Sequence, residues 1–419
     1  MSYATQANNM ATLNGLFKER YADKIERLIP DGAKLMKEIP FISRDKQPGN
    51  FYHQPVVLGL EHGVTFAADA DGAFALNNAV PGQIKDATVR GYQLVLRSIL
   101  SYSAAARAMG PGERAFEDAT KFLVGNMLAS VTKKLEIELL YGQMEYAVVA
   151  SVSGNVISIA DTDWAPGIWA GAEQMPLDIF NASLGTQRNT PGVPVTVTAV
   201  SLENKTITVN AVPAGTVATD RIFHFGAQGK EFAGVHAILN NNTALFGIDA
   251  SVYNLWKGSL FDASLATSST QLMSFAIVEQ AIEKGIEKGL DRDVTVMVNP
   301  AHWNSLLTEQ AAKRLYDSSY SSAELENGAK VLKFHGQNGV INVIPSIYVK
   351  GGYAYVLCME DWVRVGSTDV TFKRPGQAGD NFFRDLENAA GYELRCYTDQ
   401  ALFCAKPGRS VLIKGLKTA

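Results

Sequence analysis

The stretch ERAFEDATKFLVGNMLASVTKKLEIELLYG, residues 113–142, decides how the rest of this chain is interpreted. It contains no proline, and its apolar side chains recur at helical spacing, so it predicts one helix about 43 Å long. A compact globule of 419 residues would have a radius of gyration of about 22 Å. The predicted helix would therefore cross most of such a globule. Its apolar positions are Phe116, Ala119, Leu123, Met127, Val131, Leu135 and Leu139.

These apolar positions recur every four residues after the first step, which is slightly more than one helical turn. The apolar stripe therefore drifts around the helix, and we expect different partners to bury its two ends. Gly125 lies inside the helix, where glycine costs about 1 kcal/mol relative to alanine, and this indicates a close neighbour at that position. An ordinary long core helix is the alternative interpretation.

The composition indicates a globular protein with a sizeable core. The chain has 419 residues, 47% of them hydrophobic and 19% charged, which is enough for two or three domains. A formal net charge of −4 argues against a dedicated nucleic-acid binder. No apolar run approaches the roughly 20 residues that cross a bilayer, and MSYATQANNM lacks the features of a signal peptide, so no membrane partner is expected. Three cysteines, an odd number, fit a reducing cytoplasm better than a disulfide framework.

Residues 1–50 are predicted to form an arm. Leu13, Phe17, Tyr21, Ile25 and Leu28 lie at helical spacing among mixed charges. One small apolar stripe cannot stabilise such a segment alone, so the arm must fold back on the core or dock on a neighbour.

Residues 51–110 are predicted to form an extended, two-stranded loop. Two strand-like runs, NFYHQPVVLGLEHGVTFAAD and DATVRGYQLVLRSILSYSA, flank a connection that is rich in glycine, alanine and asparagine. An isolated hairpin is only marginally stable in water, and this one carries several large apolar side chains. We therefore expect another chain to cover it. The apolar residues include Val64, Phe66, Val89, Leu94 and Leu96.

The remaining chain indicates an α+β fold. Residues 148–226 contain short strand-like runs with turns at 153–155 and 203–204, which predicts a small antiparallel barrel or sandwich inserted between helical parts. Residues 272–289 are predicted to form a second amphipathic helix, with Glu279 in its register. Residues 294–298 read as a buried strand, after which Asn299 caps a helix that starts at Pro300. Further strands follow, so we expect a mixed sheet.

The sequence contains no recognisable catalytic, cofactor-binding or metal-binding constellation. Cys358, Cys396 and Cys404 form no CxxC pair and have no histidine at ligand spacing, which favours buried apolar cysteines over a metal site. The six histidines are scattered, and His302, just after a helix start, is expected at the surface or a sheet edge. No phosphate-binding loop, dinucleotide-binding loop, nucleophile elbow or calcium loop is present. We therefore expect no catalytic residue, no cofactor, no enzyme activity and a structural role.

The order of these elements resembles that of the major capsid proteins of tailed bacteriophages, which share the Hong Kong 97-type capsid fold. VTVMVNPAHWNSLL resembles the family's strand, Asn-Pro, helix segment, and PSIYVKGGYAYVLCMEDWVRVG and GYELRCYTDQALFCAKPGRSVLIKGL resemble its closing strands. The resemblance covers most of the chain, although only some members have an insertion domain. It divides the chain into an N-terminal arm (1–50), an extended loop (51–110), a spine helix with part of the peripheral domain (111–147), a β insertion domain (148–226), and an axial domain with the remainder of the peripheral domain (227–419).

The resemblance implies a shell subunit of the virion that is assembled in the bacterial host cytoplasm. Such subunits form hexamers and pentamers that tile an icosahedral head around double-stranded DNA, contacted non-specifically, with a portal protein at one vertex. Only about fifty residues precede the loop, which favours a separate scaffolding protein, and a decoration protein is a further candidate partner. Candidate inter-subunit contacts are Phe66, Phe74 and Leu76 in the loop and Tyr21 and Ile25 in the arm, and Lys85 is a candidate cross-linking lysine.

Two alternatives remain open. An encapsulin-like bacterial compartment would keep the fold and change the cargo. A cytoplasmic α+β enzyme would instead need a concave pocket that contains titratable groups.

Overall fold

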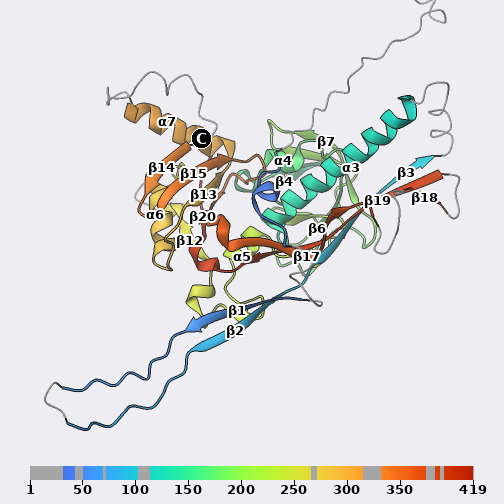
Figure 1. Cartoon of the computed structure of the whole chain (residues 1–419). Coiled ribbons are helices and arrows are strands. Elements are labelled where there is room, and N and C mark those ends of the chain that lie inside the picture. The colour runs from blue at the N-terminus through green and yellow to red at the C-terminus, as the bar shows by residue number, and fades with distance from the viewer. Residues whose placement is uncertain are drawn as a thin grey trace, which may run out of the picture. The chain divides into compact units, whose positions relative to one another are not determined.

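The computed structural model describes residues 32–42, 51–68, 72–101, 114–265, 271–314, 332–373, 383–386 and 391–418, without the side chains of 101, 114–122 and 310–314. All of these residues belong to one compact unit, Asp31–Ala419. Helices, two larger sheets, two two-stranded ribbons and a barrel occur together in the described residues, which confirms the α+β class (Figure 1). None of the described helices is both long and apolar enough to cross a bilayer.

The predicted long helix is present as α3, Arg114–Tyr141, with 28 residues (Figure 1). From Met127 onward its apolar stripe is buried by different partners, whereas the side chains of Phe116 and Ala119 lie outside the described residues. Met127, Val131 and Leu135 pack with Leu394 and Cys396 in one cluster. One turn later, the stripe joins a second and larger core. Its members there are Ile137, Leu139, Leu140 and Tyr141.

The close neighbour that we expected at Gly125 is absent from the described part of the subunit. A Cβ atom added at this position would meet no described atom within 4 Å. The expectation was wrong because a glycine within a helix needs no packing partner. Gly125 carries a cost in backbone conformational entropy, and no contact in the described part of the chain offsets this cost.

Gly125→Ala is therefore expected to raise the free energy of unfolding by about 1 kcal/mol. Urea denaturation of the purified protein measures this change. Gly142→Ala is the matched control, because its added Cβ would lie 2.2 Å from the carbonyl oxygen of Phe232 and must destabilise the fold. A Gly125→Ala variant no more stable than wild type would contradict the assignment of this position as open.

The centre of the first sheet is β19. The strands β17 and β18 pair with different parts of one of its edges, and β3 pairs with its opposite edge. The strand β3, Tyr92–Ser101, pairs antiparallel with β19, Gly391–Cys404, along ten residues from Tyr92↔Gln400 to Ser101↔Gly391. The helix α3 packs on one face of this sheet (Figure 1). The other two strands are β17, Trp362–Thr371, and β18, Arg384–Asp385.

This pairing corrects the predicted extended loop. Residues from Tyr92 onward belong to the sheet and not to the loop, because β3 finds its partner in a strand some 300 residues further along the chain. Leu94 and Leu96 pack under α3, and Val89 is buried. The expectation that another chain covers these three residues was therefore wrong, since their own chain buries them.

The second sheet has six strands in the order β12-β20-β16-β13-β15-β14. It is mixed, as expected, because β12 and β20 are parallel, β13 and β15 are parallel, and the other pairs are antiparallel. Its strands are β12, Ser259–Asp262; β13, Val294–Val298; β14, Leu332–Gly336; β15, Gly339–Pro345; β16, Tyr353–Leu357; and β20, Val411–Lys414.

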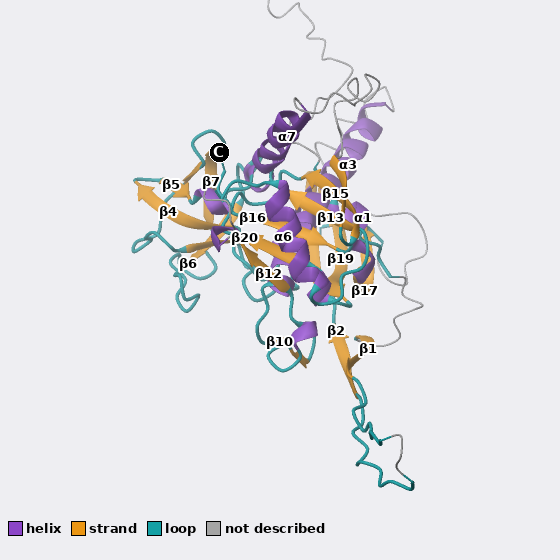
Figure 2. Ribbon diagram, turned by 90° about the vertical axis from the view of Figure 1, so that its left-hand side faces the viewer, coloured by secondary structure: helices purple, strands orange, loops and turns teal. Residues whose placement is uncertain are grey.

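Two helices accompany this sheet. The helix α6, Phe275–Ile286, lies on one of its faces (Figure 2). It begins three residues later than predicted because Ser274 caps it, and Glu279 is exposed while Ile277 and Val278 are buried. The helix α7 is Pro300–Arg314, and the side chain of Asn299 accepts a hydrogen bond from the Ala301 N–H at 3.0 Å, which confirms the predicted cap.

The predicted β segment forms a closed barrel in the order β4-β5-β8-β7-β6-β9. It is a barrel and not a sandwich because β4 pairs with both β5 and β9. Ile157, Val197, Ile207 and Ile222 are fully buried and fill it. Its strands are β4, Ala147–Ser153; β5, Val156–Ile159; β6, Pro176–Phe180; β7, Val195–Ser201; β8, Thr206–Val209; and β9, Arg221–His224.

The remaining elements are short. The helices are α1, Leu35–Glu38; α4, Pro166–Trp169; and α5, Val235–Leu239. The strands are β1, Tyr52–Gly59; β2, Gln83–Val89; β10, Ala244–Leu245; and β11, Ile248–Asp249. Single turns of 3-10 helix occur at Asp161–Asp163, Asn254–Trp256, Ala263–Leu265, Met359–Asp361 and Pro407–Arg409.

Candidate assembly interface

The extended loop begins as a two-stranded ribbon. The strands β1 and β2 pair antiparallel from Tyr52↔Val89 to Gly59↔Gln83. Beyond them, residues 60–68 and 72–82 form two arms that run side by side away from the sheets (Figure 1). The His62 N–H donates to the Val80 carbonyl at 3.1 Å, and the side-chain amide of Asn77 donates to the Val64 carbonyl at 3.0 Å. Hydrogen bonds between the arms therefore help to hold the loop together.

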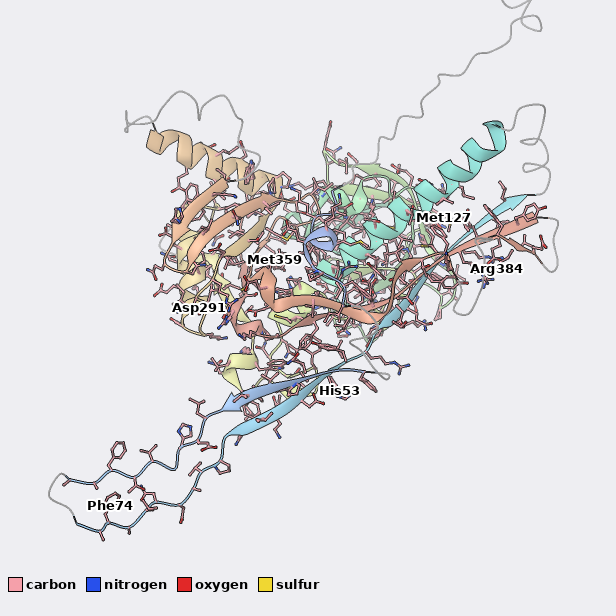
Figure 3. The ribbon with its side chains drawn as sticks, in the orientation of Figure 1. His53, Phe74, Met127, Asp291, Met359 and Arg384 are labelled. Carbon is pink, nitrogen blue, oxygen red and sulfur yellow. The ribbon has the colours of Figure 1, made fainter. Side chains whose placement is uncertain are left out.

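Large apolar side chains are exposed along these arms. Phe66 is 92% exposed, Leu76 79% and Phe74 52%, and Figure 3 shows Phe74 near the far end of the loop. Leu60, Val64 and Val80 are exposed as well. A monomeric protein rarely gathers such residues in one projecting segment, whereas interaction sites do.

The base of the loop is held firmly. The Thr88 N–H donates to the Phe246 carbonyl at 2.9 Å, and the Tyr253 hydroxyl donates to the Gln83 side chain at 2.5 Å. The ring of Phe403 on β19 lies 5.3 Å from that of Tyr52 and 5.2 Å from that of Phe246. The ribbon thus leaves the subunit from an aromatic cluster that fixes its two ends. Lys85 lies exposed on β2, opposite Val56, and its cross-linking role stays a prediction.

The end of the predicted arm is part of the core. Leu35 and Ile39 are buried, and the carboxylate of Glu136 on α3 accepts hydrogen bonds from the N–H groups of Lys34, Leu35 and Met36 at 3.0, 2.9 and 2.9 Å. Burial raises the pKa of Glu136, and the three N–H groups oppose that shift. Residues 32–42 therefore fold back on the core, which is one of the two outcomes expected for the arm.

A second contact fixes the same segment. The side chain of Arg364 on β17 donates to the Ile39 carbonyl at 3.0 Å, while its backbone N–H donates to the Pro40 carbonyl at 2.8 Å. Both contacts join chain positions more than 300 residues apart, so no local sequence signal could have predicted them. Tyr21 and Ile25, the arm's candidate contacts, lie outside the described residues.

The cysteines and the histidine at position 302 lie in the core. Cys358, Cys396 and Cys404 are free and buried, as expected, and burial raises the pKa of Cys396 to about 11. His302 is also buried, which overturns the expected surface position. Its Nε2 lies 2.7 Å from the carbonyl oxygen of Gly351, and burial lowers its pKa. The side chains that the structure describes contain no group of three His, Cys, Asp or Glu that would hold a metal ion.

No protein-family model matches the chain, and no curated protein sequence is significantly similar to it. Solved structures do match along nearly the whole length. A capsid subunit of cyanophage A-1(L) is 10% identical, with a TM-score of 0.59 over 98% of this chain and 99% of that one. The capsid of a native GTA particle is also 10% identical, with a TM-score of 0.51 over 98% and 99% of the two chains. An encapsulin complex from Synechococcus elongatus matches at a TM-score of 0.43 with 8% identity over 99% of this chain and 97% of that one. The chain therefore has the Hong Kong 97-type capsid fold.

Proposed function

We propose that this protein is a major capsid protein, which assembles into hexamers and pentamers that form the icosahedral shell around the double-stranded DNA of a tailed phage. The observation that carries the proposal is the extended loop, whose large apolar side chains are exposed in the subunit. The likeness to a cyanophage capsid subunit supports it. The barrel would then be an insertion domain of this subunit, and the molecule would serve as a structural component of the virion and not as an enzyme.

The energetics suit repeated, modest contacts. Burying one large apolar side chain such as Phe66 or Leu76 stabilises a contact by about 1.5–3 kcal/mol. Each subunit of a closed shell has several neighbours, so interfaces of roughly 1,200–2,000 Å² reinforce one another. A net charge of −4 suits a wall that contacts packaged DNA only non-specifically. A portal protein, a scaffolding protein and a decoration protein are the further partners that this role implies.

Electron microscopy and sedimentation of the purified protein test the proposal. We expect shells, capsomers or other large oligomers, with or without a scaffolding protein. A protein that stays monomeric under all conditions, with scaffolding protein present, would rule the proposal out. Particles filled with protein cargo and free of nucleic acid would instead identify a bacterial compartment of the encapsulin type.

A variant with Phe66→Ser and Leu76→Ser is expected to raise the subunit concentration needed for assembly by at least about a hundredfold. Two lost anchors of about 1.5 kcal/mol each give a factor of this size, since 1.4 kcal/mol corresponds to tenfold in affinity. Light scattering over a dilution series measures the threshold. Val193→Ser, which alters a 58% exposed apolar side chain on the barrel, is the control and should leave the threshold unchanged. If both variants assembled above the same subunit concentration, the loop side chains would not be part of the interface.

A further inference from the structure

The barrel is joined to the rest of the chain by two short segments, residues 142–146 before β4 and residues 225–234 after β9, which we call the neck. Both segments pack against the last turn of α3. The Gly234 N–H donates to the Gly142 carbonyl at 3.0 Å. A Cβ on Gly234 would lie 2.7 Å from the carbonyl oxygen of Glu138, so the backbones touch without side chains between them. This contact therefore ties both segments of the neck directly to the end of α3.

A buried charged cluster lies at the same place. Lys134 on α3 forms an ion pair with Glu231 of the neck at 3.0 Å, and its ammonium also donates to the hydroxyl of Tyr146. Glu138 lies one turn further along α3, on the same side of the helix as Lys134. Glu138 and Glu231 are each only 5% exposed. The cluster thus joins α3 to both segments of the neck.

The charges of this cluster do not balance. One ammonium faces two carboxyl groups, so the ionised cluster would hold an excess negative charge away from water. The Oε2 atom of Glu138 has no hydrogen-bond partner among the described residues, although the Phe232 N–H donates to the same carboxyl group. A protonated Glu138 would leave a neutral Lys134–Glu231 pair.

The electrostatics favour that protonated form near neutral pH. Burial raises the pKa of Glu138 to about 7, Lys134 opposes the shift, and Glu231 adds to it. His224, at the end of β9, is a further titratable group that interacts with Lys134. Burial, together with the nearby Lys134, lowers its pKa to about 4, so its ring stays neutral while Glu138 titrates.

We propose that Glu138, Lys134 and Glu231 form a proton-controlled latch that holds the barrel neck against α3. The latch is closed when Glu138 is protonated. It loosens when Glu138 ionises, because opening exposes the excess negative charge of the cluster to water. Glu138 is favoured in its protonated form in the closed state, so closure is strongest below the ordinary glutamate pKa and weakens as the pH rises through about 7.

Hydrogen exchange of the full-length protein tests the latch. After correction for the intrinsic exchange rate, we expect opening of residues 142–146 and 225–234 to increase about tenfold between pH 6 and pH 8. Glu138→Gln keeps the shape of the protonated side chain and should abolish this increase. Glu231→Gln leaves Lys134 free to pair with Glu138 and should move the transition to a distinctly lower pH.

Glu145→Gln is the matched control, because Glu145 lies in the neck but pairs with Arg221 at 3.3 Å, outside the cluster. It should keep the wild-type transition. The near-ultraviolet circular dichroism of every variant at pH 6 checks that the fold is retained. An unchanged transition in Glu138→Gln, or the absence of any increase in the wild type, would overturn the proposal. A transition that does not move in Glu231→Gln would also overturn it.

Discussion

A subunit in which residues 60–82 are replaced by a two-residue Asn-Gly turn is expected to fold with nearly unchanged stability and to form no shells. The turn closes the ribbon where β1 and β2 end, at the pair Gly59↔Gln83. The aromatic cluster at the base and the bond from Tyr253 to Gln83 remain in place. The removed arms bond to each other and expose their apolar side chains, so their loss costs the isolated subunit little. Assembly, in contrast, loses every anchor that the loop provides.

Thermal unfolding and electron microscopy of the same preparation measure the two effects. A second variant keeps the full loop length and changes its apolar side chains to serine. It separates the effect of loop length on assembly from the effect of apolar contacts. These side chains are Leu60, Val64, Phe66, Phe74, Leu76 and Val80. Normal shells from the shortened subunit would show that its contacts lie elsewhere on the molecule.

Glu136→Ala is expected to lower the free energy of unfolding by about 3 kcal/mol. The substitution removes the acceptor of three backbone N–H groups, and that of Leu35 is buried. A buried donor left without a partner costs about 1–3 kcal/mol, and hydrogen bonds to a charged group lie at the upper end. Residues 32–42 would then lose one of their attachments to the core, while the bonds from Arg364 would remain.

Urea denaturation of unassembled subunits measures this loss. Glu136→Gln retains one side-chain oxygen as an acceptor and should lose clearly less stability than Glu136→Ala. Glu38→Ala changes an exposed carboxylate in the same segment and should stay within about 0.5 kcal/mol of wild type. A loss below about 1 kcal/mol in Glu136→Ala would mean that water replaces the carboxylate at little cost.

Elements whose signals are local could be predicted from the sequence. The long helix follows from its apolar spacing, and the strand Val294–Val298 follows from its run of β-branched residues. The cap at Asn299 and the start at Pro300 follow from backbone hydrogen bonding within four residues. The short alternating runs after residue 147 were sufficient to predict a small all-β segment, which the structure closes into a barrel. The exposed loop residues Phe66, Phe74 and Leu76 could also be selected from the sequence, because they are apolar side chains in or beside a connection rich in glycine, alanine and asparagine that has no core of its own.

Contacts between segments far apart in the chain could be identified only in the folded molecule. The sequence predicted a strand-like run over residues 86–104 but could not identify β19 as the partner of its second half, so the loop was predicted too long. The burial of His302, the three-way hydrogen bonding of Glu136 and the cluster of Lys134 with Glu231 have the same origin. Lys134 and Glu231 lie 97 residues apart in the chain, and no sequence periodicity connects them. Burial and charge pairing are properties of the packed chain, because each depends on neighbours that the backbone brings together only after the local elements have formed.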